Sequence, residues 1–360
     1  MNLNSIRRFS TKIAVHISHR DVLEYFVVVV SVIGIIHLFG SSPEYALRQL
    51  VFAAIGITLF YLLRLNFIRE NLKHLIVPFY IFTLFMLGGV LFTDPIKGAS
   101  RWFNIFGFSI QPSEFAKIST ILALSHCVTY VRSFIQNRVL LLALLFVIIL
   151  IPAALIFVQP DFGSAFLLAF TSFVFLLLVF RISKKEMVII MFLTFLGVVF
   201  VFLNLKEFQK KRIISYLSSF SKTQETQGNF NSVQAKIAIG SGGFWGKGLG
   251  SGTQSKLAFL PEDHTDFAFS SYAEQFGLFG VFILMSLIVL IISNMIRSLQ
   301  RNKFPVIRKT LVGIIILFTV QVFVNICMNI GLLPIVGVPL PFISYGGSSL
   351  LVWFFMMGLF

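Results

Sequence analysis

The chain has 360 residues, of which 57% are hydrophobic, 15% aromatic and only 12% charged. Soluble globular proteins carry about 25% charged residues, so this composition and a mean hydropathy of +0.91 exclude a water-facing surface over most of the chain. Cys127 and Cys327 both lie in apolar runs, which excludes a disulfide scaffold and a cysteine-built zinc site. We predict an all-α integral membrane protein.

Apolar stretches long enough to be membrane-spanning helices, which need about 20 residues, recur along the chain. They are 22–39, 49–63, 75–92, 113–131, 139–158, 162–180, 187–204, 267–295, 310–329 and 347–360. We therefore expect about ten transmembrane helices in a single domain over 22–360, preceded by a cytoplasmic segment over 1–21. Because no small-residue cleavage site follows the first stretch, we expect it to remain as a signal anchor.

The basic residues predict the orientation in the membrane. With the N-terminus inside, 17 of the 29 basic residues fall in inner segments and ten of the 14 acidic residues fall on the outer side. The positive-inside rule favours this arrangement. We expect both termini in the cytoplasm, the protein in the cytoplasmic (inner) membrane, and a large extracytoplasmic loop, 205–266, between helices seven and eight. The net charge of +15 is then explained without a nucleic-acid partner.

The first segment that can carry chemistry is 98–117. It combines Arg101 and Trp102 with Glu114 and Lys117, and the last two are three residues apart on one helix face, where they can form an ion pair. Such a pair can simply hold the bundle together. Ionisable residues at membrane depth, however, usually line a cavity, and Arg101 and Lys117 together can hold a pyrophosphate.

Two further segments allow both a structural and a functional interpretation. Asp161 follows Pro160 in a short turn and can cap the sixth helix or take part in catalysis. The stretch 240–252 has seven glycines in thirteen residues and includes Lys247, but it fails the Walker A spacing. It is either a linker or a segment whose backbone can approach a ligand closely.

The long loop ends in Glu262-Asp263-His264-Thr265-Asp266, directly before the eighth helix. This spacing is not that of a zinc motif. Thr265 or Asp266 can cap the helix. Alternatively, Asp266, Ser270 and Glu274 form a polar stripe facing a cavity, and Asp266 acts as a general base.

The stretch 325–349 contains three prolines and four glycines between two apolar helices. We predict a folded-back, partly re-entrant segment, because irregular backbone at membrane depth must be buried in protein or line a cavity. A compact loop without a ligand role is the alternative.

Five motifs give the chain a family resemblance. They are RWF with QPSEFAK over 101–117, QPDFG over 159–163, AIGSGGFWGKGLGSGTQS over 238–255, FLPEDHTDF over 259–267 and GLLPIVGVPLPFISYGGSS over 331–349. With them, the chain resembles the SEDS family (shape, elongation, division and sporulation) over essentially its whole length. GTQS followed by FLPE is more similar to the elongation branch than to the division branch.

The resemblance implies a peptidoglycan glycosyltransferase that polymerises lipid II into β-1,4-linked glycan strands at the outer face of the cytoplasmic membrane, for cell elongation and rod shape. Asp266 matches the family's essential aspartate, and we predict it as the catalytic base. Trp102, Glu114 and Lys117 match positions of functional importance in the family.

The remaining expectations concern ligands and partners. We predict substrate binding by Arg101, Trp102, Glu114, Lys117, Arg212 and Lys247, and support from Asp161, Glu262, His264 and Glu274. A divalent cation (Mg²⁺ or Mn²⁺) can assist, although no dedicated metal site is visible. The resemblance implies a nascent glycan strand, a class B penicillin-binding protein and other elongation-complex proteins as partners.

Three alternatives remain open at this point. A lipid II flippase would distribute ionisable groups through both leaflets, whereas here they cluster on the predicted outer side. A scaffold that only recruits a transpeptidase would leave the acid–base cluster unexplained. A paralogue of the division branch would share the chemistry.

Overall fold

The computed structural model describes residues 19–94, 99–105, 108–180, 186, 227–257, 259–300 and 302–360. Helices dominate these residues. In chain order they are α2 (His19–Ser41), α3 (Pro43–Leu63), α4 (Asn66–Gly89), α5 (Pro112–His126), α6 (Arg132–Phe134), α7 (Arg138–Val158), α8 (Phe162–Val179), α11 (Gln227–Ser241), α12 (Thr253–Lys256), α13 (Ala268–Leu299), α14 (Pro305–Asn329) and α15 (Gly347–Gly358). A 3₁₀ turn, Val90–Phe92, extends α4, and a π turn, Cys127–Val131, extends α5.

Three helices begin at a proline in the first turn: α3 at Pro43, α5 at Pro112 and α14 at Pro305. Proline suits this position, where the missing N–H has no helical partner. Consequently α3 and α14 begin six and five residues before the apolar runs predicted from 49 and 310. The apolar run marks the part of a helix that lies in the membrane, and the proline marks where the helix itself begins.

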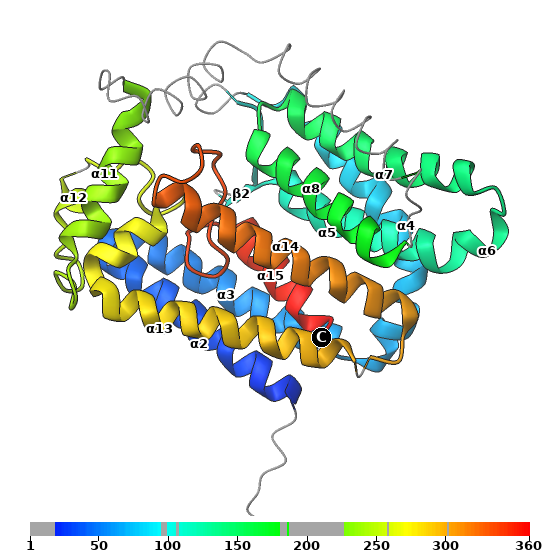
Figure 1. Cartoon of the computed structure of the whole chain (residues 1–360), viewed down its shortest axis with the longest axis horizontal. Helices are drawn as coiled ribbons and strands as arrows, with labels where there is room; N and C mark the ends of the chain where they lie inside the picture. The colour runs from blue at the N-terminus through cyan, green and yellow to red at the C-terminus, as the bar shows by residue number, and fades with distance from the viewer. Residues whose placement is uncertain are drawn as a thin grey trace, which may run out of the picture.

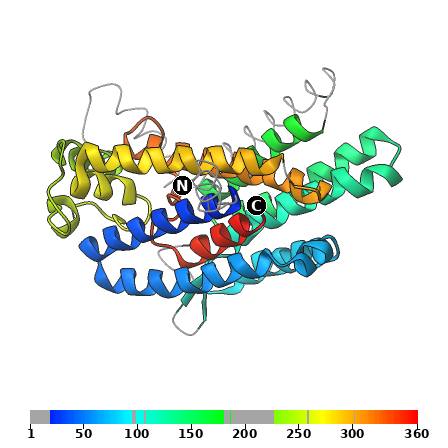
Figure 2. The same ribbon diagram turned by 90° about the horizontal axis from the view of Figure 1, so that it is seen from below.

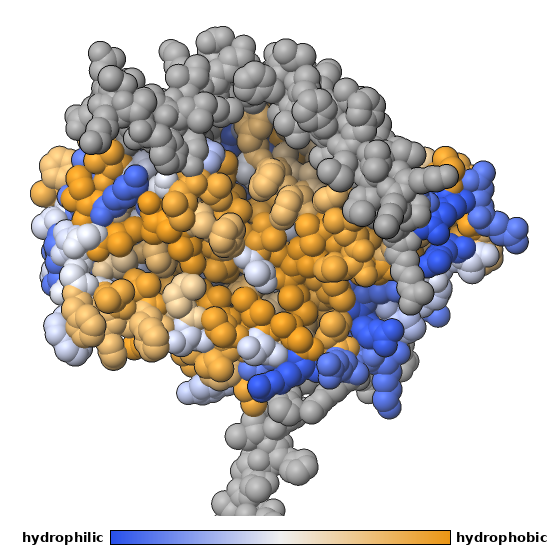
Figure 3. All heavy atoms as spheres, in the orientation of Figure 1, coloured by the Kyte–Doolittle hydropathy of each residue, from blue (hydrophilic) through white to orange (hydrophobic). Residues whose placement is uncertain are grey.

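Seven of the helices in the described part of the chain are long and apolar enough to cross a membrane: α2, α3, α4, α7, α8, α13 and α14. The protein is a multi-pass membrane protein. Hydrophobic residues cover the middle of the view in Figure 3, and hydrophilic ones gather toward the end that carries α6 and the start of α14. Of the other three predicted spans, 187–204 lies outside the described residues. The spans 113–131 and 347–360 correspond to α5 with 15 residues and α15 with 12, which are shorter than the seven candidates, so the count of ten stays a prediction.

The core has two parts that share α4 and α5. One part joins these two helices to α2, α3, α13, α14 and α15, and the other joins them to α7 and α8. Figure 2 shows α13, α2 and α3 as successive layers, and Figure 1 shows α14 between the two parts. Residues 112–125 of α5 are buried apart from Phe115, which is half-buried, so the polar residues that begin α5 lie inside the bundle.

The structure confirms the helical fold class and adds three details to the expected architecture. A short antiparallel hairpin, β1 (Phe103–Ile105) with β2 (Phe108–Ile110), precedes α5. Part of the predicted loop 205–266 is helical, because Ala235 and Ala238 of α11 pack on Leu260 and Phe267. The eighth predicted helix, 267–295, is two helices joined at Gly277, whose φ is +65°.

The segment 330–346, between α14 and α15, is irregular and folds back into the bundle (Figure 1). Its Leu340, Phe342 and Ile343 are buried in the first part of the core. Gly34 of α2 lies so close to the Phe342 carbonyl that a Cβ on it would approach that oxygen to 2.3 Å. The prediction of a folded-back segment buried in protein is confirmed.

Candidate active site

Asp266 lies directly before the first residues of α13. The N-cap of α13 is Phe267, which makes no side-chain cap. The Thr265 hydroxyl donates to Glu262. The Asp266 carboxylate lies beside Gly337 of the irregular segment, where Oδ2 would be 3.5 Å from a Cβ placed on this glycine. Asp266 therefore faces the segment 330–346, and its role as a base or as a helix cap stays a prediction.

A row of three buried carboxamides on α14 lies opposite Asp266. Gln321, Asn325 and Asn329 are four residues apart and 0% exposed. The side-chain Nδ2 atoms of Asn325 and Asn329 both donate to the backbone carbonyl of Asp266, at 3.1 Å each. Asn329 Oδ1 accepts from the backbone N–H and the hydroxyl of Ser270. These three residues, the carboxamide row, join α14 to the start of α13.

Glu114 and Lys117 form the predicted ion pair on α5, with Nζ 2.7 Å from Oε1 and both side chains 2% exposed. Lys117 Nζ also donates to Gln321 Oε1 at 3.3 Å. The second carboxylate oxygen of Glu114 is buried and has no hydrogen-bond partner among the described residues. A buried acceptor left in this way is costly in an apolar bundle, which favours a role at a site over a purely structural one.

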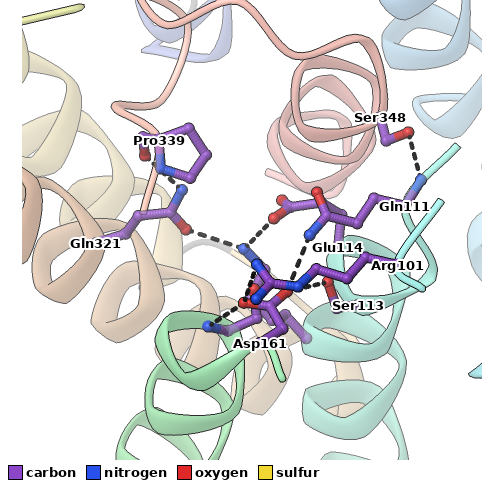
Figure 4. A network of polar contacts seen from close by, with 10 residues as sticks. Arg101, Gln111, Ser113, Glu114, Asp161, Gln321, Pro339 and Ser348 are labelled. Carbon is purple, nitrogen blue, oxygen red and sulfur yellow. Dashed lines mark hydrogen bonds and ion pairs between the residues drawn. The ribbon is translucent and has the colours of Figure 1, made fainter. Parts of the chain in front are cut away.

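Asp161 is the N-cap of α8, where its Oδ1 accepts from the Ser164 N–H. The same carboxylate accepts from Gln111 Nε2 at 3.0 Å and from Ser113 at 3.3 Å. The capping interpretation of Asp161 is confirmed, and the capping carboxylate also contacts the start of α5. Figure 4 shows this arrangement. A part of Asp161 in catalysis stays a prediction.

Arg101 approaches Asp161 from the hairpin. Its Nη1 is 3.8 Å from Asp161 Oδ1, its Nε donates to the Gln159 carbonyl at 3.1 Å, and its Nη2 donates to the Pro160 carbonyl. Trp102 is half-buried beside it, directly before β1. Because Ser113, bound to Asp161, and Glu114, bound to Lys117, are neighbours in sequence, the Arg101–Asp161 and Glu114–Lys117 groups meet at the first turn of α5 (Figure 4).

Four consecutive residues of the irregular segment contact these groups. Val336 lies against Gly163, which follows Asp161 closely, and Gly337 lies against the Asp266 carboxylate. The Val338 carbonyl accepts from Asn325 at 2.7 Å, and the Pro339 carbonyl accepts from Gln321 at 2.9 Å. We call residues 336–339 the site strand. It contacts the predicted base, Asp266, directly and is linked to the buried Lys117 through Gln321.

His264 belongs to the wall of this region. Its ring stacks on Tyr45 of α3 with the centroids 4.3 Å apart, and Nδ1 lies 3.1 Å from Asp263. The His264 carbonyl accepts from the Tyr345 N–H. The loop 262–266 is thereby fixed to α3 and to the segment before α15.

Lys247 and Glu274 lie in a different region, where the glycine-rich segment meets α13. Lys247 Nζ is 2.6 Å from Glu274 Oε1, and the same oxygen accepts from the Thr253 hydroxyl and the Gln254 N–H. The polar stripe predicted from Asp266 to Glu274 is therefore divided. The Asp266 carboxylate faces the segment 330–346, the Ser270 hydroxyl faces α14, and Glu274 faces the glycine-rich segment. We call Glu274 with its partners the loop clamp.

The glycines of this segment allow backbone to pack on backbone. A Cβ on Gly246, whose φ is +82°, would lie 2.2 Å from the Gln275 carbonyl oxygen, and one on Gly242 would lie 2.2 Å from that of Ala273. Backbone hydrogen bonds run from the N–H of Leu278 and of Phe279 to this segment. The linker interpretation is wrong, because these contacts tie the segment to α13.

Sequence reasoning missed the carboxamide row. A signal was present: carboxamides at 321, 325 and 329 recur every four residues in an otherwise apolar run, which places them on one helix face. Of the predicted residues, the structure brings Arg101, Glu114, Lys117, Asp161 and Asp266 to one region and separates Lys247 with Glu274 from it. Arg212 lies outside the described residues.

Fold and site together define a multi-pass helical membrane protein with a charged site buried between its helices. The model of the FtsW, RodA and SpoVE cell cycle proteins matches residues 14–360. The chain belongs to this family, the SEDS family.

Named relatives and solved structures agree with this assignment. The chain is 37% identical to the peptidoglycan glycosyltransferase MrdB of Escherichia coli K12, over 71% of this chain and 68% of that protein. It is 35% identical to MrdB of Helicobacter pylori (95% and 89% covered). It resembles Thermus thermophilus RodA with a TM-score of 0.68 and 27% identity (94% and 93% covered). A chain from a peptidoglycan synthase complex gives a TM-score of 0.77 and 28% identity (94% and 95% covered).

Proposed function

We propose that this chain is a peptidoglycan glycosyltransferase that polymerises lipid II. Relatives that it matches over most of their length carry this activity in their names. The observation that carries the proposal is that Asp266 lies beside Gly337 of the site strand, while the buried Glu114–Lys117 pair reaches Pro339 of the same strand through Gln321. Transfer of a sugar from a lipid pyrophosphate to a hydroxyl needs a base at one point and cationic groups at another.

In this proposal Asp266 accepts the proton of the 4-hydroxyl on the GlcNAc of one lipid II. The oxygen attacks the anomeric carbon of the MurNAc that ends the growing strand. A new C–O bond forms as the bond to the pyrophosphate breaks, and undecaprenyl pyrophosphate leaves with the electron pair. Inversion at the anomeric carbon gives a β-1,4 link.

Lys117 and Arg101 are the cationic groups that we assign to the pyrophosphate. An ammonium has three N–H donors, and Lys117 directs two of them to Glu114 and Gln321, which leaves a third for a phosphate oxygen. The Arg101 guanidinium, which is planar and suited to phosphate, is held by the Gln159 and Pro160 carbonyls. Arg212 and Trp102 stay predictions for substrate binding.

A divalent cation also stays a prediction. Among the residues that the structure describes, no group of three or more His, Cys, Asp and Glu side chains is placed to hold a metal ion. Mg²⁺ is often bound by one or two carboxylates together with substrate phosphates, and Asp161 and Glu114 are the carboxylates close to the proposed pyrophosphate position. If bound there, the cation would neutralise charge on the leaving group.

We further propose the elongation branch, an inner-membrane location with both termini in the cytoplasm, and a class B penicillin-binding protein as partner. The GTQS and FLPE motifs favour the branch, and the distribution of basic residues favours the orientation. The peptidoglycan synthase complex that the chain resembles coordinates polymerization with crosslinking, which supports a transpeptidase partner. Depletion should give rounded cells, whereas filaments would indicate the division branch.

The test is incubation of the purified, detergent-solubilised protein with lipid II, alone and with its transpeptidase, followed by gel separation of glycan strands. Detergent removes the two compartments that a flippase needs. Strands formed by the wild-type protein support the proposal. No strands with an active partner present, together with lipid II translocation in liposomes, would favour the transporter.

A further inference from the structure

We propose that the carboxamide row of α14 (Gln321, Asn325 and Asn329) consists of positioning residues that hold Asp266 and Lys117 in register for glycosyl transfer. This inference rests on the proposed function and goes beyond it, since none of the three residues belongs to the motifs that define the predicted site. The row does not touch the reacting atoms in this proposal. It acts through the groups that it holds.

The burial of the row requires an explanation. Three carboxamides at 0% exposure lie in a helix long and apolar enough to cross a membrane. A polar group in such a place is costly unless it is hydrogen-bonded. All three form hydrogen bonds, and their partners include two predicted site residues, Asp266 and Lys117, as well as the site strand.

The row fixes the peptide of Asp266 itself. A carbonyl oxygen has two lone pairs, and at Asp266 it receives one hydrogen bond from Asn325 and one from Asn329. Two donors from one helix define the plane of this peptide group. The carboxylate on the same residue is therefore aimed from α14 toward Gly337.

The same row fixes the opposite side of the site. Asn325 uses its Nδ2 for the Val338 carbonyl as well, and Gln321 donates to the Pro339 carbonyl while it accepts from Lys117. Asp266, the site strand and Lys117 are thus bound to one face of one helix. The proposed base lies on a loop and the proposed cation on α5, so α14 is an element to which both are hydrogen-bonded.

A base and a leaving-group cation on separate elements need such a common support. Displacement of a reacting group by 1 Å can lower a rate by about 10²-fold. A site supported by a rigid helix is positioned more accurately than one supported by loops. A purely structural row would stabilise the bundle without affecting the reaction. A positioning role and a purely structural role therefore predict different values of kcat for variants of the row.

The experiment compares Asn325→Leu with wild-type protein in the lipid II assay and measures kcat, KM for lipid II and the pH dependence of kcat. Loss of this amide removes one of the two hydrogen bonds to the Asp266 carbonyl and the hydrogen bond to the Val338 carbonyl. We expect kcat to fall by about 10²-fold, KM to change less than about threefold, and the pH at which kcat reaches half of its maximum to move. Unchanged kcat and pH dependence in folded Asn325→Leu would overturn the inference.

Asn294→Leu is the matched control. Asn294 is a buried carboxamide of α13 whose Nδ2 donates, among the residues that the structure describes, only to the Leu290 carbonyl of its own helix. We expect it to keep wild-type kcat and pH dependence, and an equal loss in this variant would also overturn the inference.

If Asn325→Leu does not fold, Ser270→Ala tests the inference in its place. It removes one hydroxyl, 2.6 Å from Asn329 Oδ1, and should lower kcat by about 3- to 10-fold, the size of one neutral hydrogen bond, with the same shift in pH dependence. Wild-type kcat and pH dependence in Ser270→Ala would overturn the inference. A wild-type protein that makes no strands would instead defeat the proposed function, and this inference with it.

Discussion

Two lysine–glutamate pairs of nearly equal length occupy different surroundings in this molecule. The Lys117–Glu114 pair spans 2.7 Å within one helix and is 2% exposed on both sides. The Lys247–Glu274 pair spans 2.6 Å between segments 27 residues apart, and the lysine is 26% exposed. Both lysines belong to motifs predicted to bind substrate, so the sequence does not separate them.

The residues around each pair show that the two pairs have different roles. Glu274 collects donors from Lys247, Thr253 and Gln254, all in or next to the glycine-rich segment, and thus ties that segment to α13. Lys117 instead reaches Gln321 across the bundle, next to the site strand. The comparison indicates that a buried charge pair is assigned to a site by what surrounds it. The pair's own geometry does not decide.

The largest expected effect is at Asp266. Asp266→Asn should lower polymerisation by about 10²–10⁴-fold, because the amide keeps the shape of the side chain but cannot accept the proton. The measurement is strand formation from lipid II by variants of equal thermal stability. Near-normal activity would mean that the base is elsewhere, with Glu262, Asp263 and Glu114 as the next candidates.

Lys117→Met tests the buried pair at the site. We expect kcat to fall by about 10²-fold, the size of losing one preorganised donor to developing charge. Because the variant leaves Glu114 without its cation, Glu114→Gln with Lys117→Met is measured beside it. If the double variant recovers both stability and activity, the pair is structural and the proposed pyrophosphate contact is wrong.

Lys247→Met tests the loop clamp. We expect the free energy of unfolding to fall by about 1–3 kcal/mol, less than the ~3–5 kcal/mol of a fully buried pair because Lys247 is partly exposed. The kcat of the folded protein should change less than about threefold, measured after thermal unfolding has established the folded fraction. A large loss of kcat at unchanged stability would place Lys247 at the substrate, as its sequence motif suggests.

The smallest expected effect is at Gly243, in the same segment. Its φ is +56°, and a Cβ there would meet nothing within 4 Å. Gly243→Ala should therefore cost only the strain of the left-handed conformation, about 1–2 kcal/mol, without a change in kcat. A lower kcat of the folded Gly243→Ala protein would show that the clamp region takes part in the reaction.

Much of the architecture follows from sequence because a membrane imposes simple requirements. Apolar runs of sufficient length predicted the seven candidate spans in the described residues, and the prolines and glycines of 325–349 predicted irregular backbone. Helices α3 and α14 begin at Pro43 and Pro305, before the apolar runs that predicted them. Hydropathy reports the environment of a helix, whereas the backbone decides where the helix begins. The break at Gly277 needs the neighbouring glycine-rich segment, which lies far enough away in sequence to be invisible to local patterns.

The candidate site divides in the same way. The sequence by itself determined that the protein is a multi-pass membrane protein of the SEDS family, that Glu114 and Lys117 pair on one helix turn, and that Asp266 is the candidate base. Hydropathy, helical spacing and motif identity are local properties, so each of these conclusions needs no knowledge of the fold. Only the tertiary structure decided that Asp266 lies beside Gly337, that Glu274 clamps a loop, and that Gln321, Asn325 and Asn329 face the site. Those contacts join residues up to 204 positions apart, and a buried polar group is bound to partners that helix packing brings near, wherever they lie in the chain.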